Sequence, residues 1–182
     1  MIFFKLLFLK SIHKRESNLF SVIFKKENIG FLSLQFTVFF SKMTTLPIQR
    51  SACIFCNIVN KLESTEILYE DDDVCVFPDI KPASKLHILV VPKRHIDDVK
   101  CLTAADKDLV SKLLLVAHEQ LAKSNLPLTD ARLGYHWPPF RSVRHLHLHA
   151  IAPASEMGFI SRLIFRKDSY WFVSPDYVAS RL

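Results

Sequence analysis

The spacing of apolar and polar residues predicts a sheet of short strands. Ile67–Tyr69 and Val74–Phe77 flank an acidic turn and together predict a β-hairpin. Leu86–Val91 is a β-branched run of strand length, and a proline follows it. Ala131–Tyr135 also has the length of a strand, and Leu146–Ala152 alternates as a strand with one buried face does.

One stretch has the period of an amphipathic helix. Thr103 and Asp106 fit a capping box. Apolar residues then recur with helical spacing on one face: Val110, Leu113, Leu114, Ala117 and Leu121. Cys53–Val59 and Phe159–Phe165 are long enough for one or two turns, and Ser169–Leu182 is an aromatic-rich tail. Strands around a single long helix predict an α+β domain with a mainly antiparallel sheet.

Residues 1–42 differ in composition from the rest of the chain. They hold nine of the fifteen phenylalanines and seven Lys/Arg against two Glu. Their apolar runs are shorter than the roughly 20 residues of a membrane-spanning helix, and their order is not that of a signal peptide. We expect an N-terminal extension over 1–42, either disordered or a gene-model artefact, with a mitochondrial transit peptide as the alternative. A domain over 43–182, with its core at about 53–153, then follows.

The net charge of +6 comes from that extension, because the remaining 140 residues hold 17 basic and 16 acidic side chains. This balance argues against an extended nucleic-acid surface. The cysteines are one C-x-x-C pair and two residues in apolar runs, which is not the pattern of a secreted disulfide framework. We therefore expect a protein of the cytoplasm or nucleus that is not bound to a membrane.

The strongest chemical signal is the run His145-Leu-His147-Leu-His149. In a strand, alternate side chains share a face, so the three imidazoles would point one way and the leucines the other. Such a row suits metal binding, because neutral imidazole is a common zinc ligand. It equally suits nucleophilic catalysis, in which one imidazole attacks while its neighbours orient it. The residues alone leave both readings open.

This run resembles the histidine-triad superfamily when it is taken together with Phe77–Pro82 and His87–His95. Within the superfamily, the chain is similar to the histidine triad nucleotide-binding proteins, and aprataxin has similar local patterns. Four segments carry this finer likeness: Leu133–His136, Pro138–Phe140, Gly158–Leu163 and Ser169–Phe172.

The resemblance implies a hydrolase that releases AMP from adenosine or other purine nucleoside 5′-phosphoramidates and from acyl-adenylates. It implies His147 as the nucleophile that forms a covalent nucleotidyl-histidine intermediate. His145 and His149 would orient His147 and contact the phosphate, and His87 would complete the cluster. It further implies a homodimer or larger homo-oligomer, and catalysis without a cofactor.

The resemblance also implies a nucleotide site. Asp79 matches the ribose-binding position, Ile80 would pack on the base, and Ser142 matches a serine that bonds the phosphate or leaving group. Leu148 lies in the same set, with His147 and His149.

The chain departs from the family pattern around Ser142. Phe140-Arg141-Ser142-Val143 replaces the Gly-Gln-Ser-Val of the best-known branch. Gly134 lies near the place of an asparagine in that branch, and His136 is a candidate for part of its work. Arg141 and Arg144 either favour a more anionic substrate or face solvent.

A structural zinc site is a further hypothesis. Cys53 and Cys56 have zinc-ligand spacing, and some superfamily members complete such a site at the positions of His95 and His145. The alternative is that both cysteines are small buried residues on a helical turn.

Two further functions stay open beside phosphoramidate hydrolysis. One is hydrolysis of dinucleoside polyphosphates or adenylated DNA, although the zinc finger of aprataxin has no counterpart after Cys101. The other is a non-catalytic nucleotide-binding module. Transfer rather than hydrolysis is disfavoured by His149, because relatives that transfer typically end the triad with Gln.

Overall fold

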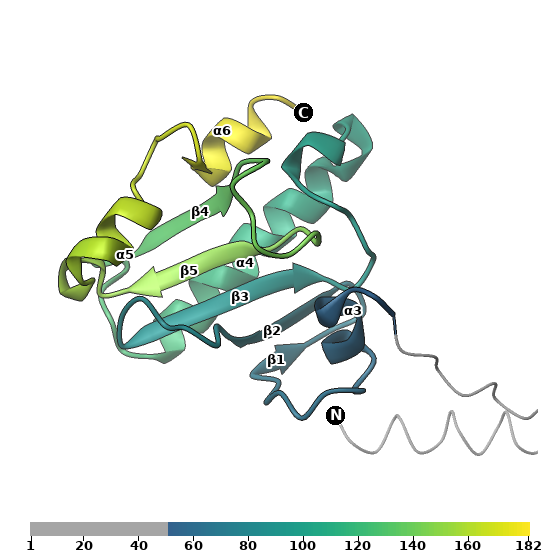
Figure 1. The fold of residues 1–182 in the computed structure, drawn as a ribbon, viewed down its shortest axis with the longest axis horizontal. Helices are drawn as coiled ribbons and strands as arrows, with labels where there is room; N and C mark the ends of the chain where they lie inside the picture. Colours follow the sequence, from purple (N-terminus) through teal and green to yellow (C-terminus); the bar gives the residue numbers. More distant parts are fainter. Residues whose placement is uncertain (1–50) are drawn as a thin grey trace, which may run out of the picture. The chain divides into compact units, whose positions relative to one another are not determined.

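The computed structural model describes residues 51–182, and its centre is an antiparallel sheet in the order β1-β2-β3-β5-β4-β6 (Figure 1). The expected extension over 1–42 and the domain start at residue 43 lie outside these residues. The strands are β1 Tyr69–Glu70, β2 Val74–Pro78, β3 Leu86–Pro92, β4 Arg132–His136, β5 Leu148–Ala152 and β6 Phe172–Val173. The predicted α+β class with an antiparallel sheet is confirmed.

The central strands β3 and β5 form where the β-branched run Leu86–Val91 and the alternating run Leu146–Ala152 predict them. Leu89 pairs with His149, and Ile88 pairs with Ala150. Strand β5 is two residues shorter at its start than Leu146–Ala152, because Leu146 donates its N–H to the Ile96 carbonyl 2.6 Å away in a loop.

The long helix α4, Lys107–Lys123, covers one face of the sheet. The predicted capping box lies at the 3₁₀ turn Ala104–Asp106 that leads into α4, where the Thr103 N–H donates to Asp106 Oδ2 at 2.8 Å. The face turned to the sheet buries Val110, Leu113, Val116, Ala117 and Leu121, while Leu114 is half-buried. Burying such an apolar stripe is the main stabilising contribution of an amphipathic helix.

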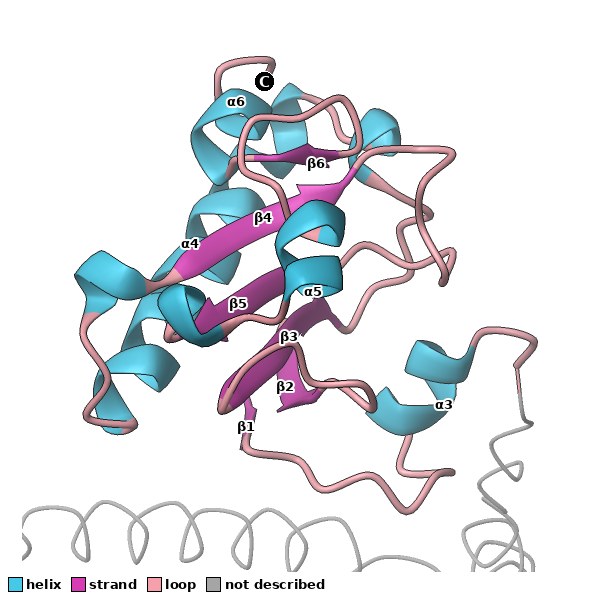
Figure 2. Cartoon of the chain, turned by 60° about the vertical axis from the view of Figure 1, so that its left-hand side comes forward, coloured by secondary structure: helices cyan, strands magenta, loops and turns pink. Residues whose placement is uncertain are grey.

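Two short helices lie against the opposite face. Helix α3, Ile54–Val59, packs Phe55 and Ile58 on β2 and β3. Helix α5, Phe159–Ile164, leads into Phe165, which packs beside β5. Figure 2 shows α3 and α5 over separate parts of the sheet, with α4 behind it. The histidine row occupies the sheet face between them.

The aromatic-rich tail Ser169–Leu182 carries regular secondary structure. It contributes β6 beside β4 and then α6, Pro175–Ala179. Gly134 makes this possible, since a Cβ there would lie 2.4 Å from the Phe172 ring. The remaining helical segments are short 3₁₀ turns: Val99–Cys101, Ala104–Asp106, Leu128–Asp130 and Ala154–Glu156. Within residues 51–182, no helix has the length and apolarity needed to cross a membrane.

Candidate active site

Four histidines are buried in one cluster on the sheet face opposite α4. His145 and His147 lie in the segment that leads into β5, His149 lies in β5 itself, and His87 comes from β3 beside it. Leu146 and Leu148 alternate with the triad and pack into the core under α4. The arrangement of three imidazoles on one face is therefore the one that the alternation predicts.

Backbone hydrogen bonding determines which nitrogen of each imidazole carries the proton. The Ala83 N–H donates to His87 Nδ1 at 3.1 Å, so His87 carries its proton on Nε2. That Nε2–H donates to His149 Nδ1 at 2.9 Å. His149 must then carry its own proton on Nε2, which is buried and has no hydrogen-bond partner among the described residues. The chain of bonds thus presents one buried N–H donor beside His147.

The tautomer of His147 follows from one hydrogen bond to the backbone. Its Nδ1 lies 2.5 Å from the His145 carbonyl oxygen, which can only accept, so Nδ1 carries the proton. The lone pair is left on Nε2. Burial lowers the pKa of His147 to about 4, and the imidazole is neutral at physiological pH. His147 is therefore both correctly oriented and unprotonated.

Burial also keeps the surrounding imidazoles neutral. It lowers the pKa of His87 to about 4, and it lowers the pKa values of His149 and His136. His136 donates from Nδ1 to the Trp171 carbonyl at 3.2 Å, and its ring centroid lies 4.9 Å from that of His149. The cluster can therefore present lone pairs and N–H donors without accumulating charge.

The residues expected to hold the nucleotide differ in their burial and contacts. Asp79 directs Oδ2 toward His87 Nε2 at 3.5 Å. Ile80 is 94% exposed, as a residue that packs on a base would be, and Ser142 is exposed near the triad. Leu148 has its side chain in the core, so only its main chain faces the histidine side.

The two arginines before the triad do not simply face solvent. Arg141 is largely buried, and its Nη2 lies 2.9 Å from Oδ2 of the buried Asp98. The more exposed Arg144 pairs with Asp97 at 2.5 Å. Both pairs tie the segment before the triad to the loop after β3, and they use the charge that could otherwise have met an anionic substrate.

A second cluster brings together Cys53, Cys56, His95 and His145, whose ligand atoms all lie within 4.8 Å of one another. His145 Nε2 donates to the Pro92 carbonyl at 2.9 Å, so its Nδ1 lone pair points at the Cys53 and Cys56 sulfurs, 3.4 and 3.5 Å away. His95 Nε2 donates to Asp97 at 3.0 Å, and its Nδ1 lies 3.2 Å from Cys56 Sγ. Two thiols and two imidazole lone pairs form a donor set that fits a tetrahedral metal ion.

Asp79, His87 and His149 also lie close enough together to suggest a metal site. However, the Ala83 N–H occupies the Nδ1 lone pair of His87, so Nε2 carries the proton and has no lone pair to give. This group therefore belongs to the hydrogen-bonded histidine cluster.

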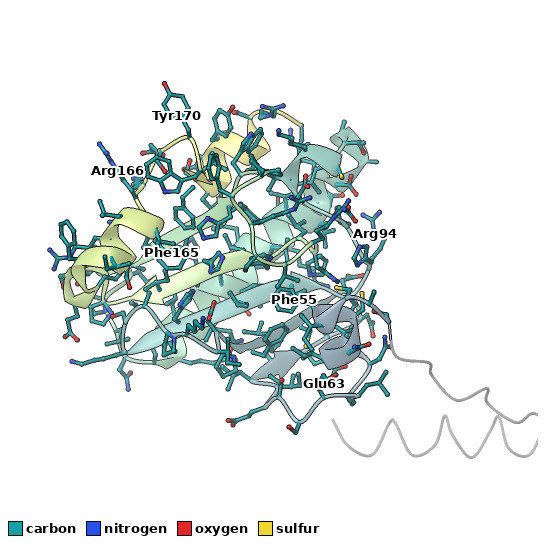
Figure 3. The ribbon with its side chains drawn as sticks, viewed as in Figure 1. Phe55, Glu63, Arg94, Phe165, Arg166 and Tyr170 are labelled. Atoms are coloured by element: carbon teal, nitrogen blue, oxygen red, sulfur yellow. The ribbon has the colours of Figure 1, made fainter. Side chains whose placement is uncertain are left out.

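Three residues of the site escaped the sequence reasoning. Phe55 stacks edge-on against His147 at 5.2 Å, and Phe165 lies 5.1 Å from the His87 ring, so the two phenylalanines border the histidines on opposite sides (Figure 3). Asp97, two residues after His95 in the chain, accepts a hydrogen bond from the His95 ring and orients it. The His-x-Asp spacing is a signal that could have found Asp97, whereas the phenylalanines only become visible in the fold.

A family model described as "Scavenger mRNA decapping enzyme C-term binding" matches residues 52–164. Adenosine 5′-monophosphoramidase HINT3 of Xenopus tropicalis is 49% identical over 133 residues, which are 72% of this chain and 87% of that protein. The bifunctional adenosine 5′-phosphosulfate phosphorylase/adenylylsulfatase HINT4 of Arabidopsis thaliana is 48% identical over 103 residues, 56% of this chain and 70% of that protein.

The fold has solved counterparts. A HIT family hydrolase from Clostridium thermocellum matches with a TM-score of 0.54 and 28% identity, covering 57% of this chain and 91% of the other. A histidine triad protein from Clostridium difficile matches with a TM-score of 0.53 and 33% identity, covering 57% of this chain and 92% of the other.

Proposed function

The chain belongs to the histidine-triad superfamily, and from this premise we propose that it hydrolyses adenosine 5′-phosphoramidates and related acyl-adenylates, releasing AMP. The observation that carries this is the proximity of two imidazoles, whose ring centroids lie 4.8 Å apart. His147 has a lone pair on Nε2, and the buried His149 Nε2–H has no hydrogen-bond partner among the described residues. One atom can attack phosphorus while the other stabilises the charge that develops on a phosphate oxygen. The name of the frog relative supports the same substrate class.

In the first step, His147 Nε2 attacks the α-phosphorus, and an N–P bond forms as the bond from phosphorus to the amine breaks. The leaving amine takes up a proton from solvent as it departs, and the water that attacks in the second step returns one. His149 donates from Nε2 to a phosphate oxygen. The His145 carbonyl accepts from the His147 Nδ1–H and so stabilises the positive charge that develops on the His147 ring. The protein contributes positioning and electrostatic stabilisation, which dominate catalysis of phosphoryl-type transfer.

In the second step, water attacks the phosphorus of the nucleotidyl-histidine. The N–P bond breaks, AMP leaves, and His147 returns to its neutral form. Asp79 and Ile80 would hold the ribose and base throughout, and Ser142 would face the phosphate or leaving group. His136 would support His149 from the adjacent strand.

Release of AMP from adenosine 5′-phosphoramidate tests the proposal, with the parent compared to His147→Asn. Asparagine keeps a polar side chain but has no imidazole nitrogen that could attack. We expect turnover in the parent, none in the variant, and AMP binding in both. Equal turnover would contradict attack by His147. Turnover only of dinucleoside polyphosphates or adenylated DNA by the parent would reassign the substrate, and binding without any turnover would leave a nucleotide-binding module.

We also propose that Cys53, Cys56, His95 and His145 hold a structural zinc ion. His145 can serve there because it supports His147 through its main-chain carbonyl and leaves its ring nitrogens for Pro92 and the metal. The ion would join α3 to the loop after β3, and four protein ligands leave no open position for catalysis.

Zinc content tests this site. Protein purified without chelator should hold about one zinc per chain, and Cys56→Ser should lose the zinc and melt at a lower temperature. Cys101→Ser is the matched control, because Cys101 is exposed and lies outside the cluster. A parent with far less than one zinc per chain would refute the proposal.

The thiols of this site would need to stay reduced, which supports the cytoplasm or nucleus as the compartment. A homodimer or larger homo-oligomer remains the assembly expected from the superfamily. Sedimentation of the full chain would test it.

A further inference from the structure

A hollow of about 590 Å³ beside α5 gathers four cationic side chains. They come from β4, from α5 and from the segment after it. The cationic hollow is lined by Arg132, Arg162, Arg166 and Lys167, together with Asp130, Ala154 and Ser155. It lies outside the histidine cluster, and Phe165, directly before Arg166, packs its ring against His87.

The single acid of the cationic hollow does not neutralise these cations. Asp130 accepts from the Ser155 N–H at 3.0 Å and from the Ser155 hydroxyl at 2.5 Å. Among residues 51–182, none of the four cations has an ion-pair partner within 4.0 Å. The hollow therefore carries a local excess of positive charge.

Two of the guanidinium groups are held in place without being neutralised. Arg132 donates to the Phe165 carbonyl at 2.6 Å. Arg162 donates to the Met157 carbonyl at 2.8 Å and to the Ser155 carbonyl at 2.7 Å. A carbonyl orients a guanidinium but adds no net charge, so an anion would meet cations that are already ordered.

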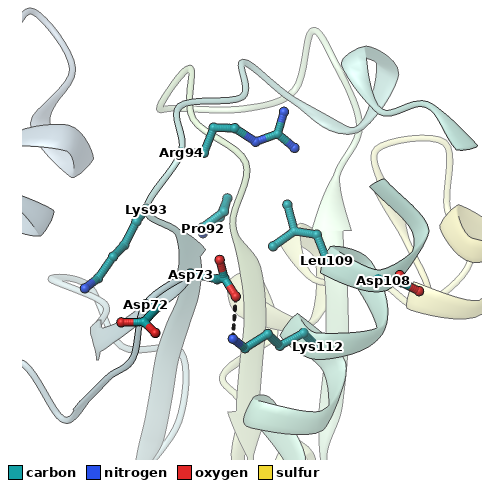
Figure 4. Close-up of a pocket in the computed structure, with 8 residues that line it drawn as sticks. All are labelled: Asp72, Asp73, Pro92, Lys93, Arg94, Asp108, Leu109 and Lys112. Atoms are coloured by element: carbon teal, nitrogen blue, oxygen red, sulfur yellow. Dashed lines mark hydrogen bonds and ion pairs between the residues drawn. The ribbon is translucent and has the colours of Figure 1, made fainter. Parts of the chain in front are cut away.

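The hollow between β3 and α4 gives a useful contrast (Figure 4). It measures about 350 Å³ and is also lined by charged residues, but there each cation has its own carboxylate. Lys112 pairs with Asp73 at 2.6 Å, and Lys93 and Arg94 also lie in ion pairs. Charges that neutralise one another leave little attraction for an anion, and in this respect the cationic hollow differs from the hollow beside α4.

An aromatic hollow of about 640 Å³ adjoins the cationic hollow and shares Arg166 and Lys167 with it. Tyr170 lines it and is 90% exposed, and Figure 3 shows Tyr170 and Arg166 extending away from the ribbon. Arg181 stacks on the Trp137 ring at 4.9 Å, and Tyr170 is the most exposed of the aromatic rings that line this hollow. Asp168 is an acid on this side.

We propose that this face binds single-stranded nucleic acid, with backbone phosphates in the cationic hollow and a base stacked on Tyr170. Ordered cations beside an exposed aromatic ring are the combination that single-strand-binding proteins use. The site is local, because residues 51–182 hold sixteen basic and sixteen acidic side chains. With about three or four phosphate contacts, log Kd should change with log salt by a slope of about 2 to 3.

Fluorescence anisotropy of the full chain with a labelled deoxythymidine oligonucleotide of about 12 nucleotides tests the proposal. The double variant Arg166→Glu/Lys167→Glu should weaken binding at least about tenfold, and Tyr170→Ala should weaken it about tenfold. Lys107→Glu/Lys123→Glu makes the same change in net charge on α4 and should bind nearly as the parent does. Turnover of adenosine 5′-phosphoramidate by each variant, or the melting temperature of the variant, shows that it is folded.

Three results would overturn the proposal. The first is no binding by the parent at low salt, and the second is an equal loss in the α4 control. The third is displacement by inorganic tripolyphosphate at equal phosphate concentration together with unchanged binding by Tyr170→Ala. That result would identify a site that binds phosphate groups without contacting a base. None of the three depends on whether His147 is the nucleophile.

Discussion

Replacing His87 by asparagine should remove part of the acid sensitivity of the fold. His87 is buried with its Nδ1 accepting from the Ala83 N–H, and burial lowers its pKa from 6.5 to about 4. In the unfolded chain the same imidazole is in water and titrates near its ordinary value. As the pH falls from 7 to 5, the unfolded chain gains a proton that the folded protein does not take up.

The size of the effect follows from this difference in pKa. The stability that neutral His87 contributes is fully present above pH 6.5 and is lost as the pH falls toward 4. One such proton gives a slope of about 1.4 kcal/mol per pH unit in that window. Integration between pH 7 and pH 5 gives a loss of about 2 kcal/mol in the free energy of unfolding.

Urea unfolding at both pH values measures this loss for the parent and for His87→Asn. The amide oxygen of asparagine can still accept from the Ala83 N–H but does not titrate. The parent should lose about 2 kcal/mol more than the variant between pH 7 and pH 5. His118→Asn, on the exposed face of α4, should lose as much as the parent. Equal losses in the parent and His87→Asn would refute a buried neutral His87.

Two further predictions concern the packing around the site. Gly134→Ala should destabilise the protein by about 1–3 kcal/mol, because the new Cβ would lie 2.4 Å from the Phe172 ring. Gly158→Ala is the control, because its Cβ would meet no atom within 4 Å. Equal melting temperatures of the two variants would contradict the role given to Gly134 in β6 packing. Tyr135→Phe should leave the free energy of unfolding unchanged or raise it by up to about 1 kcal/mol, because it removes a buried hydroxyl that has no hydrogen-bond partner among residues 51–182. A clear loss of stability in urea unfolding would show that the hydroxyl is hydrogen-bonded.

The local pattern was enough to predict the central strands, the long helix and the histidine row. These elements depend on period and capping, and β5 and α4 are stabilised by the faces that the pattern marks as apolar. Strand β6 could not be predicted, because two residues form a strand only where Gly134 lets Phe172 approach β4. The aromatic tail therefore becomes an edge of the sheet only through tertiary contact.

The candidate site follows the same division. The sequence places the imidazoles on one face but cannot say which nitrogen carries each proton, since that depends on Ala83 and on the His145 carbonyl. The sequence also left two roles open for Arg141, which were attraction of an anionic substrate and exposure to solvent. The structure pairs Arg141 with Asp98, 43 positions away in the chain, which no local pattern reveals.

Direct detection of the covalent intermediate is the most direct test of the central claim. Mixing the protein with adenosine 5′-phosphoramidate, quenching within one turnover and mapping the adduct by mass spectrometry would locate the nucleotidyl group. The account predicts one adenylyl group on His147 Nε2, and none in the His147→Asn variant. Turnover with the adduct on another residue, or turnover that leaves no adduct at any quench time, would contradict it.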